Sequence, residues 1–178
     1  MKKITIMLIA LVGSAMIFTS CSKDSNQPVT YSLSNQDFVA RSASYFNFQI
    51  QAGNLAKSKG VNDSVKSYGT AMVTDNTAAY ATLKTLATAK GLTVTTTLQS
   101  TDQTNLSSLS SQSGAAFDQS YAQMMILTHN QEIALFNLGS QSNGVADADL
   151  RSFSFSQVPS LTLRLQMAYS LQTLVGAK

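Results

Sequence analysis

The stretch VNDSVKSYGTAMVTDNTAAYATLKTLATAKG, from Val61 to Gly91, decides the fold of this chain. Its apolar residues advance by threes and fours, with one interval of seven, as on one face of an α-helix; they are Val61, Val65, Tyr68, Met72, Ala79, Leu83 and Leu86. Asn76 fills the long interval and therefore falls on the face that is predicted to be buried. Lys90 and Gly91 predict the end of the helix, because a cation in the last turn followed by glycine is common there.

A first helix is predicted before this stretch. Ser34 resembles an N-cap, since Asp37 follows three residues later, much as in a capping box with Asp in place of Glu. Gly60 is predicted to end this helix. The apolar residues between these signals recur at helical spacing; they are Phe38, Val39, Ala43, Phe46, Ile50 and Leu55.

Two more helices are predicted after Gly91. Residues 92–101 are rich in threonine and lack helical spacing, so they predict an extended crossover loop, with a short strand as the alternative. A third helix is predicted from Asp102 to Ser140, with a break near Gly114. A fourth is predicted from Asp147 to Leu174, and Pro159 inside it predicts a kink or a break.

These patterns predict an all-α fold. Alternating strand patterns are absent from the sequence, and long helices joined by short turns favour an antiparallel four-helix bundle. The longest connection falls between the second and third helices. We therefore expect one helical-bundle domain over residues 34–176.

The N-terminal segment predicts export and lipid attachment. Lys2 and Lys3 precede an apolar run that is shorter than the about 20 residues of a membrane-spanning helix. The run ends in the motif FTSC at residues 18–21, which resembles the lipobox of bacterial lipoproteins. Cys21 is the only cysteine, so it has no disulfide partner within the chain. Residues 1–20 are interpreted as a lipoprotein signal peptide and Cys21 as the lipidation site; an ordinary signal peptide or a plain anchor helix is the alternative.

The next segment, residues 21–33, predicts a flexible lipidated tether, because it is polar, contains Pro28 and lacks helical spacing. Several acyl chains on one cysteine anchor a protein stably, whereas one chain binds only marginally. Ser22 stands where an aspartate would resemble an inner-membrane retention signal, so we expect the outer membrane. Its periplasmic side and the cell surface both stay open.

The composition offers little for catalysis or for nucleic-acid binding. The net charge is +3, no basic run occurs and tryptophan is absent, so no nucleic-acid partner is expected. His129 and Glu132 are the only histidine and glutamate, and with Cys21 acylated a Cys/His zinc site cannot be assembled. The sequence has no Gly-x-Ser-x-Gly motif and no glycine-rich phosphate loop. We expect no catalytic residue, no cofactor and no enzymatic activity.

His129 and Glu132 are three residues apart, so on one helix they share a face. One interpretation is half of a metal site or of a proton relay. The other is a partly buried histidine with a local carboxylate partner, which we favour because metal sites need ligands that converge from several elements. Tyr121, Met124 and Met125 resemble a ligand box, but their spacing is that of an ordinary core.

Four stretches together resemble the DUF4142 family of exported bacterial proteins. They are DFV at 37–39, MVTDN at 72–76, GAAFDQSY at 114–121 followed by His129, and VPSL at 158–161. The resemblance covers residues 34–174, and the run at 114–121 is its most distinctive part. It implies a ferritin-like four-helix fold.

The chain departs from this family at its polar positions. Family members commonly have a histidine where this chain has Asn76, another where it has Arg164, and an acidic residue where it has Gln49. A guanidinium cannot bind a metal, because it is not deprotonated in proteins. A ferritin-like di-metal centre needs about four carboxylates and two histidines, so we expect no metal in this chain.

The resemblance instead implies a polar cluster in the bundle interior, made of Gln49, Asn76, His129, Glu132 and Arg164. Arg164 is predicted to pair with Glu132 or Asp75 in place of a metal's charge, while the two amides complete the hydrogen bonds. The alternative is that Arg164 extends to the surface. The candidate ligands, if a metal did bind, are His129, Glu132, Asp75 and Asp118.

The function that these observations favour is that of a membrane-anchored envelope lipoprotein with a non-enzymatic helical domain. Its expected partners are the membrane, through the lipid on Cys21, and an unidentified protein or other component of the envelope. The alternative is a ferritin-like metal-binding or redox stress protein with a degenerate site. A third possibility is a module that holds a small apolar ligand between its helices.

Overall fold

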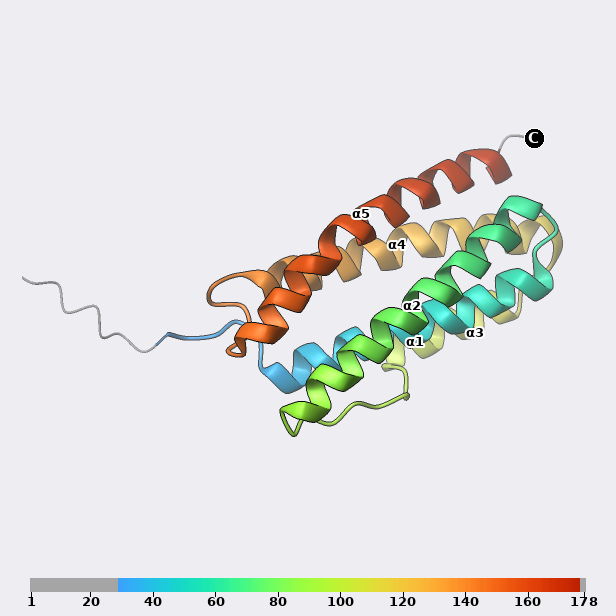
Figure 1. The fold of residues 1–178 in the computed structure, drawn as a ribbon. Helices are drawn as coiled ribbons and strands as arrows, with labels where there is room; N and C mark the ends of the chain where they lie inside the picture. The colour runs from blue at the N-terminus through green and yellow to red at the C-terminus, as the bar shows by residue number, and fades with distance from the viewer. Residues whose placement is uncertain (1–28, 177–178) are drawn as a thin grey trace, which may run out of the picture.

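The computed structural model describes residues 29–176 and confirms the all-α fold (Figure 1). Within this range the chain forms five helices and no strand: α1 (Asn35–Lys59), α2 (Asp63–Ala89), α3 (Ser100–Ser110), α4 (Gly114–Ser140) and α5 (Ala148–Gly176). None of these helices has the length and apolarity needed to span a membrane. The predicted signal peptide, Cys21 and the predicted tether up to Pro28 lie outside the described residues.

Side-chain caps explain where three of the four long helices, α1, α2 and α5, begin; Ser113 before α4 makes no such bond. At the start of α1 the Ser34 Oγ accepts a hydrogen bond of 3.0 Å from the Asp37 N–H, as the sequence predicts. Before α2 the Asn62 Oδ1 accepts the N–H two residues later at 2.8 Å. Before α5 the Asp147 Oδ1 accepts the Leu150 N–H at 2.9 Å. These oxygens satisfy backbone donors that the first turn of a helix leaves free.

The chain that leads into α1 is tied to the loop between α4 and α5. The Ser32 N–H donates to the Asn143 carbonyl at 2.8 Å, and the Leu33 N–H donates to the Gly144 carbonyl at 3.0 Å. These two backbone bonds fix the entry into α1 beside that loop.

The predicted third helix is divided into two helices. α3 ends at Ser110 and α4 begins at Gly114, so residues 29–176 hold five helices where four were expected. Gly114 has a φ of 60°, in the left-handed region that favours glycine. The break that was expected near Gly114 is therefore found. Because of this break, α3 packs mainly on α1 and is not a continuation of α4.

Two details of the predicted helices differ in the structure. Val61 is 59% exposed and precedes the N-cap Asn62, so the buried face of α2 begins at Val65. α5 continues through Pro159 without a break. Pro159 and Phe155 both lie on the exposed side of α5, so water can bond the Phe155 carbonyl, which loses its helical donor at the proline.

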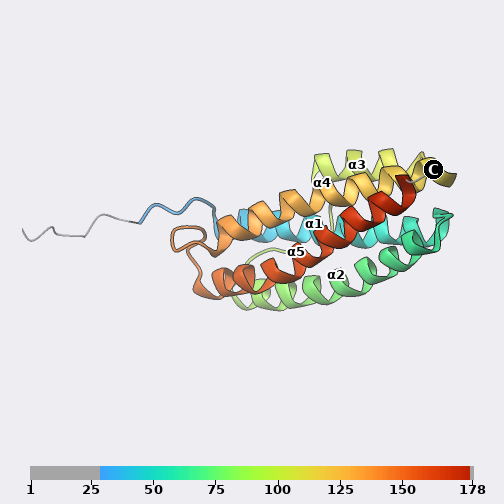
Figure 2. The same cartoon turned by 90° about the horizontal axis from the view of Figure 1, so that it is seen from above.

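The long helices pair as two antiparallel hairpins. α1 packs mainly against α2, and α4 mainly against α5; the colours in Figure 1 show that the partners run in opposite directions. Fewer contacts join α1 to α4 and α2 to α5. α3 packs on α1 and touches α4, and Figure 2 shows it along the edge of the domain opposite to α2.

The buried apolar residues form two clusters along the helices. The first lies toward the α1–α2 turn and includes Phe48, Tyr68, Met72, Tyr121, Met125 and Ala168. The second lies toward the α4–α5 loop and includes Phe38, Phe46, Leu83, Phe136 and Leu161. Each long helix contributes to both clusters, so the boundary between them crosses the whole domain.

α1 and α2 approach each other closely where two glycines meet. A Cβ on Gly53 would lie 2.7 Å from the Gly69 carbonyl oxygen and 3.0 Å from Cγ2 of Val73. A Cβ on Gly69 would lie 2.7 Å from the Cβ of Ala56. Because a backbone oxygen cannot move aside as a flexible side chain can, only glycine fits at this crossing.

We expect Gly53→Ala to destabilise the domain. Replacing a helical glycine by alanine gains about 1 kcal/mol of helix propensity, but a forced contact in a packed interior costs about 1–3 kcal/mol. The clash is with backbone, so the cost should exceed the gain, and the melting temperature should fall. Gly176→Ala is the matched control, since no atom lies within 4 Å of its new Cβ. Equal melting temperatures for Gly53→Ala and the wild type would contradict the close crossing.

Candidate functional site

A layer of polar side chains fills the boundary between the two apolar clusters. We define the polar layer as Gln49 from α1, Asn76 from α2, Thr128, His129 and Glu132 from α4, and Arg164 from α5. All of these residues are fully buried except Arg164, which is 8% exposed. In each helix they stand between residues of the first cluster and residues of the second, so they share one cross-section of the domain.

His129 is contacted at both ring nitrogens. Its Nδ1 lies 3.4 Å from the Glu132 Oε2 and 3.5 Å from the Gln49 Nε2. Its Nε2 lies 2.9 Å from the Tyr68 hydroxyl, which donates to the Arg164 backbone carbonyl at 3.1 Å. Because that hydroxyl has a single proton, it must accept the Nε2–H of His129. In the neutral ring Nδ1 is then an acceptor, and it can donate to Glu132 only when the ring is protonated.

Tyr68 and Thr128 belong to this site, although the sequence pattern indicated Tyr68 only as a residue of the apolar face of α2 and gave no signal for Thr128. Burial raises the pKa of the Tyr68 hydroxyl, the charge of Arg164 opposes that rise, and the Glu132 carboxylate adds to it. Tyr68 therefore keeps its proton and is a constant donor to α5. Thr128 accepts a hydrogen bond of 3.1 Å from the Gln49 Nε2. A tyrosine on an apolar face was the available signal, because a buried hydroxyl needs a partner.

Arg164 connects the polar layer to the surface of α2. Its Nη2 lies 3.4 Å from the Asp75 Oδ2; the Arg164 side chain is 10% exposed and that of Asp75 is 46% exposed. Of the two partners considered for Arg164, the structure thus brings Asp75 to the guanidinium, and the guanidinium does not extend into solvent. The Asn76 Nδ2 donates instead to the backbone carbonyl one turn before it, at 2.8 Å.

Several buried atoms of the polar layer have no hydrogen-bond partner among the described residues. They are the Oε1 of Gln49, the Oδ1 of Asn76, both carboxylate oxygens of Glu132 and the Nη1 of Arg164. All but the last are acceptors. Leaving a buried polar atom unpaired costs about 1–3 kcal/mol, so the layer lowers stability unless its charges offset one another.

The polar layer does not fit a metal ion. Nowhere in residues 29–176 do three or more His, Cys, Asp or Glu side chains gather to hold one. Asp118 accepts the backbone N–H groups of Val61 at 3.1 Å and Asn62 at 2.8 Å, so it caps the α1–α2 turn. It stands eleven residues before His129 on α4, which is roughly 16 Å at 1.5 Å per residue. Arg164 adds a positive charge at the level of His129, and that charge repels a cation.

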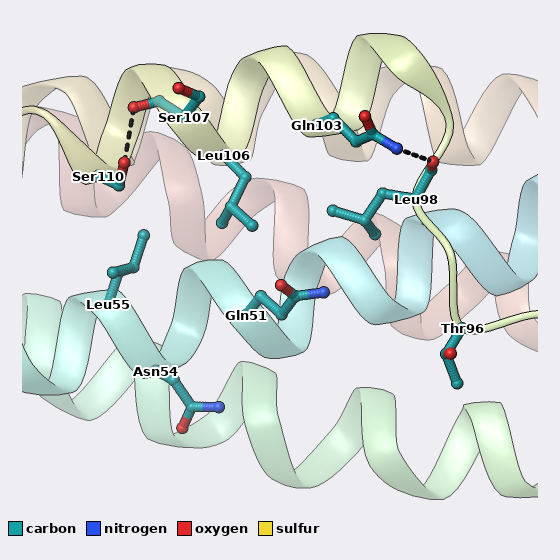
Figure 3. A pocket seen from close by; sticks show the side chains of 9 residues that line it. All are labelled: Gln51, Asn54, Leu55, Thr96, Leu98, Gln103, Leu106, Ser107 and Ser110. Atoms are coloured by element: carbon teal, nitrogen blue, oxygen red, sulfur yellow. Dashed lines mark hydrogen bonds between the residues drawn. The ribbon is translucent and has the colours of Figure 1, made fainter.

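A groove lies outside the polar layer, between α1, α3 and the loop before α3 (Figure 3). It has a volume of about 660 Å³, within the range of about 300–1,000 Å³ that is usual for small-molecule sites. We call it the α1–α3 groove; it is lined by Gln51, Asn54, Leu55, Thr96, Leu98, Gln103, Leu106, Ser107 and Ser110. Figure 3 shows Leu55 pointing from α1 toward α3, Leu106 pointing from α3 toward α1, and Leu98 entering from the loop.

Two sets of hydrogen bonds hold α3 on α1 at either end of this groove. Near the start of α3 the Ser44 Oγ donates to the Asp102 carboxylate and accepts the Gln99 N–H at 2.8 Å. Near the end of α3 the Lys59 Nζ donates to the carbonyl of Ser110, the last residue of α3, and, at 3.2 Å, to the Gln112 carbonyl. A cation is favourable there, because carbonyls at a helix C-terminus have no partner within the helix.

Asp102 is buried at the first of these attachments, with 3% of its surface exposed. Burial raises the pKa of its carboxyl above the ordinary value of 3.8, the hydrogen bond from Ser44 opposes the rise, and the Glu132 carboxylate adds to it. This attachment and the groove could not be predicted from the sequence, because their hydrogen bonds join residues that are 51, 55 and 58 positions apart. The available signal was the run of uncharged amides and hydroxyls that follows residue 92.

Comparisons with known proteins agree with the resemblance seen in the sequence. The model of a family described as "Domain of unknown function (DUF4142)" matches residues 20–171. No curated protein and no solved structure matches the chain. The matched range includes the polar layer and the groove.

We expect Arg164→Met to destabilise the domain by about 1–3 kcal/mol, the cost of leaving buried polar partners without their charge. The half-exposed Asp75 can be hydrated, which keeps the loss below the about 3–5 kcal/mol of a fully buried pair. Methionine retains the length of the side chain, so packing is largely preserved. Urea unfolding measures the change, with the exposed Lys84→Met as control. An unfolding free energy equal to that of the wild type would show that the Arg164 guanidinium does not stabilise the folded domain.

We expect Asp102→Asn to change how stability depends on pH. Between its ordinary pKa and its raised folded-state pKa, Asp102 binds a proton more tightly in the folded protein than in the unfolded chain. The stability that this proton contributes is therefore lost as the pH rises through that window. Asparagine retains an acceptor for Ser44 and has no such loss, so the variant should gain stability relative to the wild type as the pH rises.

The measurement is the difference in unfolding free energy between Asp102→Asn and the wild type at a series of pH values. Asp63→Asn is the control, because the Asp63 side chain is 96% exposed. A difference for Asp102→Asn that stays constant from acid to neutral pH would contradict a raised pKa at this position.

Proposed function

The chain belongs to the DUF4142 family, and from this premise we propose that it is a lipid-anchored envelope protein whose helical domain binds a partner and catalyses no reaction. One observation carries the proposal: His129 and Glu132, the only histidine and glutamate of the chain, are fully buried. A substrate would have to separate the helices to reach either side chain. The side chains that line the α1–α3 groove are amides, hydroxyls and leucines, which can bind a ligand but supply no general acid or base.

The anchor in this proposal is a lipid on Cys21. The FTSC motif at 18–21 supports it, and the polar segment that follows would serve as the tether. The tether would end before Ser32 and Leu33, which are bonded to the α4–α5 loop, and so would be shorter than the predicted 21–33. Ser22 after the cysteine favours the outer membrane, with the domain on its periplasmic side or at the cell surface. The partner is then another component of the envelope.

We further propose that α1, α2, α4 and α5 make up a ferritin-like four-helix bundle, with α3 as an addition within the long connection. The two antiparallel hairpins support this arrangement. So does the polar layer, because each of the four long helices contributes to it.

The second candidate is a metal-binding or redox protein with a degenerate site. The observation in its favour is that both carboxylate oxygens of Glu132 lack a hydrogen-bond partner beside the Nδ1 of His129. The Arg164 guanidinium in the same layer counts against it, because it already supplies a positive charge there.

The test uses the full chain expressed with its N-terminal segment. We expect the wild type in the membrane fraction and in the detergent phase after Triton X-114 partition, and Cys21→Ser in neither. Ser22→Ala, which keeps the cysteine, is the control and should behave as the wild type. The purified wild type, after exposure to ferrous iron, manganese and zinc, should hold far less than one equivalent of any of them.

Two outcomes would overturn the proposal. Membrane association that survives Cys21→Ser would remove the lipid anchor. Stoichiometric metal that is lost in His129→Ala, with folding intact by circular dichroism, would replace the binding function by the metal-dependent one.

A further inference from the structure

We infer that the α1–α3 groove binds a neutral glycan chain that carries acetamido and hydroxyl groups. The inference rests on the proposed binding function in the envelope, to which it adds a site and a class of ligand. Four properties of the groove carry it: its charge, its hydrogen-bonding groups, its apolar floor and the way it is held open.

The groove is uncharged. Every residue that lines it is an amide, a hydroxyl or a leucine. The nearby Lys59 is occupied by two backbone carbonyls, that of Ser110 at the end of α3 and that of Gln112 just beyond it, and the nearby Asp102 is buried against Ser44. A charged ligand would lose its hydration without gaining an ion pair, which is costly. A neutral ligand avoids this cost.

The rims of the groove offer donors and acceptors together. Gln51 and Asn54 on the α1 side are exposed carboxamides, and each carries two donor hydrogens and an acceptor oxygen. Thr96 and Ser107 add exposed hydroxyls. The Gln103 Nε2 donates to the Leu98 carbonyl at 2.8 Å, which leaves its Oε1 as an acceptor. Sugar hydroxyls and acetamido groups match this mixture, because each also donates and accepts.

The floor of the groove is a strip of leucine side chains. Leu55, Leu98 and Leu106 approach one another from three segments, and Figure 3 shows them between the polar rims. Such a strip suits the C–H faces of successive sugar rings. An extended peptide is favoured less, because it is usually recognised by an open strand edge with pockets for alternate side chains, and residues 29–176 contain no strand.

The groove is preformed. Ser44 holds the start of α3 on α1, Lys59 holds its end, and Gln103 ties the loop to α3. A ligand therefore does not have to order these segments as it binds, and that reduces the entropy lost on binding.

The test uses the full lipidated chain in detergent micelles and the β-1,4-linked tetramer of N-acetylglucosamine, followed by isothermal titration calorimetry. We expect saturable binding with a Kd of about 1 mM or tighter. The tetramer of glucose, which lacks acetamido groups, and the cationic deacetylated tetramer should both bind more weakly.

Variants of the groove locate the binding. Ser107→Trp places a bulky ring in the groove at an exposed position and should abolish binding. The double variant Gln51→Ala/Asn54→Ala removes one rim and should weaken binding by about tenfold or more, the loss expected for one or two hydrogen bonds. Gln166→Ala is the matched control, since Gln166 is an exposed amide on α5, away from the groove. Circular dichroism melts show whether each variant is folded.

Absence of saturable binding to the wild type at millimolar concentrations would overturn the inference. Binding that persists unchanged in folded Ser107→Trp would overturn it as well, since the glycan would then bind elsewhere. Displacement of the tetramer by an uncharged peptide at lower concentration would reassign the groove to peptides. Each of these results leaves the membrane fractionation and the metal content unchanged, so they are distinguishable from failure of the proposed function.

Discussion

The polar layer is the constraint on which the rest of the structure depends, because four helices must agree in register to build it. Gln49, Asn76 and Arg164 come from three of these helices and His129 from the fourth, and all lie between two apolar clusters. A shift of a helix by one turn would break the hydrogen bonds that join the helices at this level, from Gln49 to Thr128 and from Tyr68 to His129 and to the Arg164 carbonyl. The clusters supply most of the burial and tolerate many packings, whereas polar groups accept few partners. The layer therefore selects one packing among those that the apolar residues allow.

Arg164 and Tyr68 connect the polar layer to its surroundings. The guanidinium reaches Asp75 at the edge of α2, so one end of an otherwise interior network meets water. Tyr68 joins α2, α4 and α5 through a single hydroxyl, since it accepts from His129 and donates to the carbonyl of Arg164. An ion would need several carboxylates at this level, and the chain instead supplies one carboxylate, two amides and its own cation. The contacts of this layer join the four long helices at one level.

The positions of the long helices can be predicted from the sequence, because signals within one turn of the chain mark where they begin and end. Ser34 with Asp37, and Lys90 with Gly91, are signals that act within one turn of the chain. Asn76 could be placed inside because it interrupts a regular apolar face, and Gln49 and Arg164 because they depart from a family pattern.

The independent packing of α3 could not be predicted, since it depends on the contact of Ser44 with Asp102 across the fold. The partner of Arg164 was open for the same reason: spacing gives the face of a helix, but not which neighbouring carboxylate approaches it. Pro159 does not break α5, because it lies on the solvent side of the helix, where a missing hydrogen bond is tolerated.

The two backbone bonds that join Ser32 and Leu33 to the α4–α5 loop have a mechanical consequence. A load applied to the N-terminal end of the chain would reach these bonds before it reached the first turn of α1. Both bonds lie ahead of the capped first turn of α1 along the chain. The force would then pass into the turn of the α4–α5 hairpin and be spread over both hairpins. The leading segment would therefore have to detach from the α4–α5 loop before α1 could unwind from that end.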